Sequence, residues 1–88
     1  MKVLIFYRPD SEQSRSVDEF THEFNHRHPG SELTLVDVDS VSGAQQAVVY
    51  EIMKHPTVLA LGDDGAVLQR WDSGLMPLIN EVAYYTNQ

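Results

Sequence analysis

The sequence predicts an α/β fold with the element order βαβαββα, in which a four-stranded mixed sheet has helices on both faces. Short apolar runs alternate with segments where apolar residues recur every three or four positions, as in strands connected by helices. The last two apolar runs flank a turn that contains Asp64-Gly65, which favours a hairpin. The 88 residues suffice for one domain, which we expect to span residues 1–88.

The first strand and the first helix are predicted from the first third of the chain. Val3–Tyr7 is aliphatic or aromatic throughout, as in a strand that is buried on both faces. A helix is predicted over Ser11–Arg27, because its apolar residues share one face: Val17, Phe20 and Phe24. Two patterns can cap its first turn, either a single cap at Asp10 or Ser11 or a capping box of Ser16 and Glu19.

The second strand and helix follow after a Pro-Gly break. Leu33–Val38 is predicted to be a strand, and Ser40–Gly43 to be a loop and cap. The helix after it presents an apolar face and is expected to stop before Pro56. This face consists of Ala44, Ala47, Val48 and Ile52.

The last third of the chain predicts a hairpin and a third helix. Thr57–Leu61 and Ala66–Trp71 are the two strands of the hairpin, joined by the turn Gly62–Gly65. A final helix is expected after Gly74, with Pro77 tolerated in its first turn. Its apolar residues are Leu75, Ile79, Val82 and Ala83.

The composition excludes several classes of function. Six Lys and Arg against thirteen Asp and Glu give a net charge of −7, so nucleic acid and anionic membranes are not expected as partners. The chain contains no cysteine, which excludes disulfides, thiolate metal sites and a cysteine nucleophile. The opening apolar run is too short for the core of a signal peptide, and we therefore expect a cytoplasmic protein.

One motif of a zinc hydrolase is present. His22-Glu23-Phe24-Asn25-His26 matches His-Glu-x-x-His, in which the two histidines bind zinc and the glutamate is the general base. However, His22 and His26 fall about 160° from the apolar helix face and should point to solvent. They are therefore kept only as a weak surface metal candidate, and no metal or other cofactor is predicted.

Three segments, taken in order, resemble the thioredoxin superfamily and its short glutaredoxin-like members. Residues 6–14, Phe-Tyr-Arg-Pro-Asp-Ser-Glu-Gln-Ser, are similar to the glutaredoxin strand, basic residue, proline and Cys-x-x-Cys motif. Residues 50–59 are similar to the Tyr-x-Ile-x-x-x-Pro-Thr run, whose proline is cis in that family. Residues 62–74 resemble the hairpin that ends in a glycine. The resemblance implies a thioredoxin-like βαβαββα fold over essentially the whole chain.

The same resemblance implies that the redox chemistry of the family is missing. Ser11 and Ser14 stand at the positions of the two cysteines, so the motif is Ser-x-x-Ser. A serine hydroxyl is a far weaker acid than a thiol and forms no disulfide, so dithiol–disulfide exchange is excluded. Both serines have a second interpretation, as residues that satisfy free backbone N–H groups where the helix begins.

The resemblance also implies a ligand groove at the former redox site. A cis Pro56 would expose the backbone of His55, which in the family pairs with the cysteinyl part of glutathione or with an extended peptide. Arg8 stands where glutaredoxins place a Lys that binds a glutathione carboxylate, whereas the family's Gly-Gly and acidic loop is absent from residues 72–76. The predicted groove comprises Arg8, Pro9, Ser11, Ser14, His55, Pro56 and Thr57.

The leading hypothesis is a redox-inactive module that binds a protein or an extended peptide and performs no turnover, since no residue pairs a nucleophile with a general base. Two alternatives remain open. One is a glutaredoxin-like thiol–disulfide oxidoreductase represented by a variant with Ser in place of Cys at positions 11 and 14. The other is a noncovalent glutathione binder.

Overall fold

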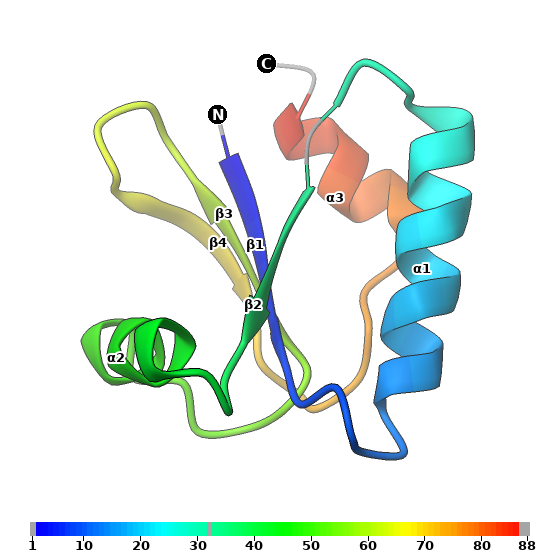
Figure 1. Ribbon diagram of the computed structural model, residues 1–88. Coiled ribbons are helices and arrows are strands. Elements are labelled where there is room, and N and C mark those ends of the chain that lie inside the picture. Colours follow the sequence, from blue (N-terminus) through cyan, green and yellow to red (C-terminus); the bar gives the residue numbers. More distant parts are fainter. Residues whose placement is uncertain (1, 32, 87–88) are drawn as a thin grey trace.

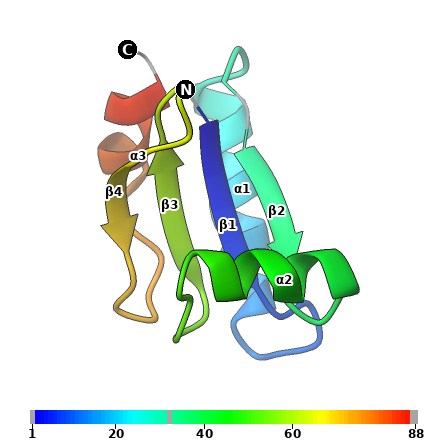
Figure 2. The same cartoon turned by 90° about the vertical axis from the view of Figure 1, so that its left-hand side faces the viewer.

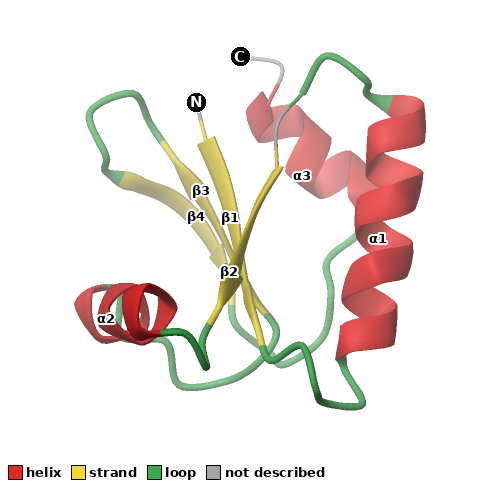
Figure 3. Ribbon diagram, viewed as in Figure 1, coloured by secondary structure: helices red, strands yellow, loops and turns green. Residues whose placement is uncertain are grey.

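A four-stranded mixed sheet organises the chain, as the sequence predicts. The computed structural model describes residues 2–31 and 33–86. In chain order the elements are β1 Lys2–Tyr7, α1 Ser14–Arg27, β2 Leu33–Asp37, α2 Val41–Val49, β3 Thr57–Leu61, β4 Val67–Trp71 and α3 Ile79–Thr86 (Figures 1 and 3). The strand order is β2-β1-β3-β4. β1 runs parallel to β2 and antiparallel to β3, and β3 and β4 form the predicted hairpin.

The two faces of the sheet are covered unequally. α1 and α3 lie on one face, where Val17, Phe20 and Phe24 of α1 are buried against alternate residues of β1 and β3, as predicted (Figure 1). Of the helices in residues 2–31 and 33–86, α2 alone lies on the other face, where it crosses one end of the strands (Figure 2). The core there is a smaller cluster that includes Leu4 and Phe6.

Residues 1, 32, 87 and 88 of the predicted domain lie outside the described residues. The extent of the domain over residues 1–88 therefore stays a prediction. Within the described part of the chain, no helix combines the length and the apolar character that a bilayer span requires.

The first helix begins later than predicted. α1 starts at Ser14 instead of Ser11, and its N-cap is Gln13, which makes no side-chain cap hydrogen bond. Neither predicted cap is formed. Ser11 Oγ donates to Arg8 O at 2.6 Å, and Ser16 Oγ donates to Gln13 O at 2.9 Å, so both hydroxyls satisfy carbonyls of successive turns instead of helix N–H groups.

The second helix begins earlier than predicted, at Val41 within the segment expected to be a loop and cap, and it also ends early. Ser40 caps it by accepting the Gly43 N–H at 2.9 Å. α2 stops at Val49, which is before Pro56 as expected, but the prediction that Ile52 lies on the helix is wrong. The chain leaves the helix through two bonds, from Ile52 N to Ala47 O and from Glu51 N to Val48 O. This is a Schellman motif, in which Glu51 adopts a left-handed conformation with φ 55°.

The predicted apolar face of this helix is only partly correct. Ala47 and Ile52 pack against the core cluster on the α2 face of the sheet, as expected. Ala44 and Val48 are exposed, because the short helix contacts the sheet through the turn that contains the buried Gly43.

Glu51→Gly is expected to stabilise the protein by about 1 kcal/mol. A left-handed conformation costs a residue with a Cβ roughly that amount, and glycine removes the cost. The measurement is chemical denaturation of the variant and the wild type. The control is Gln45→Gly, at an exposed position inside α2, which should lower the free energy of unfolding by a similar amount. Equal losses of stability in both variants would contradict the expectation.

The last helix also begins later than predicted. α3 starts at Ile79, so Pro77 precedes the helix instead of lying in its first turn, and Leu75 is 73% exposed. The start is fixed by Glu81, whose Oε1 accepts the N–H of Leu78 at 3.2 Å. This reciprocal bond is the second half of a capping box and places the helix start after the proline.

Candidate functional site

A pocket of about 400 Å³ lies where the loop after β1, the segment before β3 and the loop after β4 meet. We call it the cationic groove, and its lining residues are Arg8, Ser11, Gln13, Met53, Lys54, His55 and Gly74. Arg8, Ser11 and His55 were predicted for this site from the sequence. The other four were missed, because the order of elements does not specify which loop residues face one another across the groove.

The other predicted groove residues are not among those that line the pocket. The His55–Pro56 peptide bond is cis, as the family resemblance implied. Pro56 and Thr57 are fully buried and do not line the pocket, and Thr57 Oγ1 donates to Lys54 O at 2.6 Å. Pro9 and Ser14 are half-buried outside the lining, since α1 begins only at Ser14.

The backbone of His55 is open to a partner. Within residues 2–31 and 33–86, neither its N–H nor its C=O makes a hydrogen bond. The residue directly precedes the cis bond and lines the groove. A free donor and a free acceptor on one residue are what an extended chain needs to pair in the manner of a β-strand.

The surroundings of the His55 side chain favour its neutral form. Burial lowers the pKa of His55 below its ordinary value of 6.5, the positive charge of Arg8 lowers it further, and Asp39 opposes both effects. Nδ1 is buried and has no hydrogen-bond partner among the described residues. Burial and the neighbouring guanidinium both disfavour the charged imidazolium, which accounts for the direction of the shift.

The free energy of unfolding is expected to decline as the pH falls through about 6.5. The unfolded chain takes up a proton on His55 first, because the pKa of His55 is lower in the folded state, and acid therefore favours unfolding. Urea denaturation at pH 7.5 and at pH 5.5 measures this difference. His55→Asn should lose less stability than the wild type between these values. An identical decline in both proteins would contradict the assignment.

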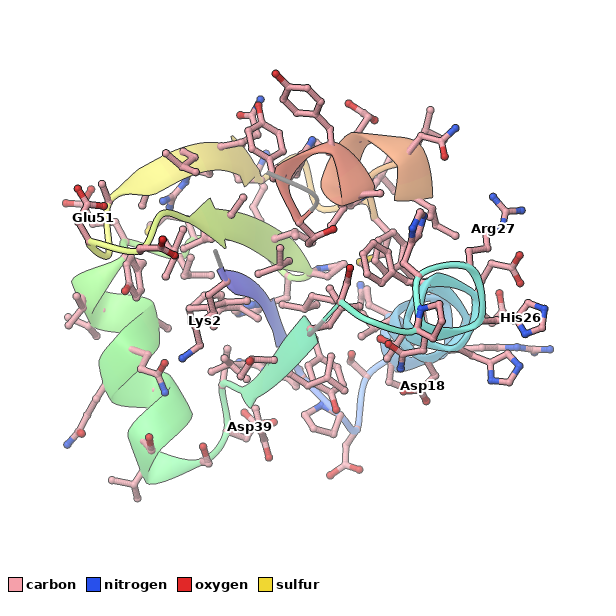
Figure 4. The ribbon with its side chains drawn as sticks, turned by 90° about the horizontal axis from the view of Figure 1, so that it is seen from above. Lys2, Asp18, His26, Arg27, Asp39 and Glu51 are labelled. Atoms are coloured by element: carbon pink, nitrogen blue, oxygen red, sulfur yellow. The ribbon has the colours of Figure 1, made fainter. Side chains whose placement is uncertain are left out.

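The groove carries positive charge, although the net charge of the protein is negative. Arg8 and Lys54 line it, and no described lining residue is an Asp or Glu. Arg8 Nε lies 3.2 Å from Asp39 Oδ1, an ion pair whose two side chains are about half exposed, and Lys54 makes no ion pair with any described residue. Figure 4 shows Asp39 between β2 and α2. An anionic ligand therefore finds two positive charges there, only one of them paired.

Arg70 positions the segment that leads into the groove. Its Nη2 donates to Tyr50 O at 2.8 Å and to Glu51 O at 2.7 Å, and its Nε donates to Asp72 Oδ2 at 3.2 Å. Figure 4 shows Glu51 at the end of α2 that lies next to the β3–β4 hairpin. α2 has no basic residue in its last turn, so β4 supplies the cation that this helix end favours.

The zinc motif does not form part of this site. His22 and His26 are exposed, as predicted, and Figure 4 shows His26 on the side of α1 that faces away from the sheet. Glu23 accepts a hydrogen bond from Arg27 Nε at 2.7 Å. Among the described residues, no three His, Cys, Asp or Glu side chains gather in a way that could hold a metal ion.

No protein-family model and no curated protein matches the sequence. Similarity appears among solved structures. Thioredoxin O2 from Arabidopsis thaliana in its oxidized state superimposes with a TM-score of 0.71 at 14% identity, over 99% of this chain and 72% of that chain. Mitochondrial thioredoxin 3 from Saccharomyces cerevisiae, also oxidized, superimposes with a TM-score of 0.69 at 18% identity, over 97% of this chain and 74% of that chain.

A structure described as a malarial protein gives a TM-score of 0.70 at 18% identity and covers 97% of this chain and 91% of that chain. At such low identities these likenesses concern the backbone alone. They show that this cysteine-free chain has a thioredoxin-like fold.

Proposed function

We propose that the protein is a redox-inactive, glutaredoxin-like module that binds an extended acidic peptide in the cationic groove and performs no chemistry on it. The observation that carries this proposal is the free N–H and C=O of His55 beside the cis bond, in a groove with two cations. Without cysteine, thiol–disulfide exchange is excluded, whereas recognition through the main chain requires no thiol.

The charges of the groove determine which peptides fit. Arg8 and Lys54 favour a carboxylate on the peptide, and Ser11 and Gln13 offer further polar contacts at the same rim. The remaining surface carries an excess of acidic residues, which repels a polyanion such as nucleic acid. A short acidic peptide is therefore a better match than an extended phosphate backbone.

The test is a titration of the isotope-labelled protein, followed by amide chemical shifts. The first probe is a nine-residue peptide of Ser and Thr with one Asp at its centre, and glutathione is the second. Saturable shifts at Arg8, Ser11 and His55 with the peptide are the expected result. If neither probe produces shifts at millimolar concentration, the proposal is wrong. Shifts with glutathione alone would favour the glutathione binder instead.

Two further experiments separate the contribution of main-chain hydrogen bonds to peptide binding from the contribution of the charged side chains. N-methylation of the peptide amide that pairs with His55 should abolish binding, whereas methylation at other amides should not. The double variant Arg8→Gln, Lys54→Gln should weaken binding about tenfold and reduce its dependence on salt. Arg15→Gln, at an exposed position on α1, is the matched control and should bind as the wild type does.

A further inference from the structure

A second pocket adjoins the cationic groove. It has a volume of about 520 Å³, and we call it the α2 pocket. Its lining residues are Ala47, Val48, Glu51, Ile52 and Met53. Met53 also lines the cationic groove, so a single side chain forms a wall of both. The two pockets are therefore neighbours on the surface.

The α2 pocket is apolar and open to solvent. Val48 is 78% exposed and Met53 is 85% exposed, while Ile52 is half-buried against the core behind them. The helix carries no charged residue from Val41 to Val49, although more than a fifth of the chain is charged. Exposed apolar side chains that line a concave surface are typical of a binding site.

We infer that the peptide carries a large apolar side chain next to its acidic residue. This inference rests on the proposed function. It describes a peptide with two anchors, one acidic side chain and one apolar side chain. The carboxylate binds at Arg8 and Lys54, the peptide backbone pairs with His55, and a Leu or Phe side chain of the peptide enters the α2 pocket. The unbranched, flexible side chain of Met53 adapts to either residue.

The charges of the two pockets, and the wall that they share, favour a peptide of this kind. Glu51, on the rim of the α2 pocket, disfavours a second acidic group there, while the groove beyond Met53 offers two cations and no described acidic residue. The two pockets thus differ in character and share a wall. A peptide with one acidic and one apolar anchor matches both, whereas a wholly acidic peptide matches only the groove.

The test uses fluorescence polarisation with labelled peptides. Starting from the nine-residue probe with the central Asp, a set of peptides is made in which Leu replaces the Ser or Thr at one position, from one to four residues away from the Asp on either side. At the matching position, the Leu peptide is expected to bind about tenfold more tightly than the parent peptide. Val48→Asp should abolish this gain while leaving the affinity for the parent peptide unchanged to within about twofold.

A matched control is available on the same helix. Val41 is 79% exposed, as Val48 is to within a per cent, but it does not line the α2 pocket, so Val41→Asp should retain the full gain from Leu. Met53→Ser is a second disrupting variant if Val48→Asp fails to fold. Circular dichroism confirms the fold of each variant before binding is measured.

The outcomes separate this inference from the proposed function. If the parent peptide binds but Leu gives no gain at any position, the α2 pocket is not used, and the proposed function stands. If the gain persists in both Val48→Asp and Met53→Ser, the apolar anchor lies elsewhere and the inference is wrong. If no peptide shifts His55 or Arg8 in the NMR titration, the proposed function itself is wrong.

Discussion

Gly43→Ala is expected to destabilise the protein by about 3 kcal/mol or more. An added Cβ would collide with the carbonyl oxygen of Asp37 and come within 2.6 Å of the carbonyl carbon. Both atoms belong to the backbone at the end of β2, so a rotamer change cannot relieve the collision, and α2 must move away from the sheet. In an unhindered helix the same substitution would stabilise the protein by about 1 kcal/mol.

Thermal denaturation of this variant measures the effect, and the melting temperature should fall by more than about 10 °C. Gly30→Ala is the matched control, since none of the described residues other than its chain neighbours lies within 4 Å of an added Cβ there. The control should change stability by less than about 1 kcal/mol. A Gly43→Ala protein as stable as the wild type would show that α2 does not approach β2 as described.

Arg70→Ala is expected to cost about 2–3 kcal/mol of unfolding free energy. The substitution removes two charge-assisted hydrogen bonds to the carbonyls of Tyr50 and Glu51, each worth about 1.5–3 kcal/mol. The expected loss is smaller than the sum of about 3–6 kcal/mol for two such bonds, because the side chain remains 30% exposed and water replaces part of the lost bonding. Chemical denaturation provides the measurement.

The control for Arg70 is Arg15→Ala, which removes an ion pair whose side chains are 88% and 69% exposed. Such exposed pairs contribute less than about 0.5 kcal/mol. Amide shifts offer a second readout, because loss of Arg70 should perturb Lys54 and His55 even though neither makes a hydrogen bond or an ion pair with it. Similar stability losses in both variants would contradict the anchoring role of Arg70.

Local patterns were sufficient to predict the fold. The alternation of apolar runs, the helical spacing of Val17, Phe20 and Phe24 and the Asp-Gly turn all concern neighbouring residues, and the structure confirms the order and mixed sheet they imply. Helix ends were predicted less well. α2 ends early because Glu51 adopts a left-handed conformation that its residue type does not favour, and no sequence pattern indicates this.

Residues of the candidate site that lie in a recognisable motif could be predicted from the sequence. Residues that reach the site through contacts between distant segments could not. Arg8, Ser11 and His55 lie in segments that resemble a known family, and they line the groove. Arg70 lies 19 and 20 residues from the two carbonyls that it binds, so only the folded chain brings them together. The early end of α2 leaves Met53 outside the helix, where it separates two pockets.

α2 buries little side-chain surface against the sheet, and this should be visible in hydrogen exchange. Gly43 is the only buried residue of α2, whereas α1 buries three large apolar side chains. α2 should therefore open in a local unfolding event of lower free energy than the opening of β1 and β3. Native-state exchange in dilute denaturant should show the amides of α2 exchanging first, while those of the central strands exchange only with global unfolding.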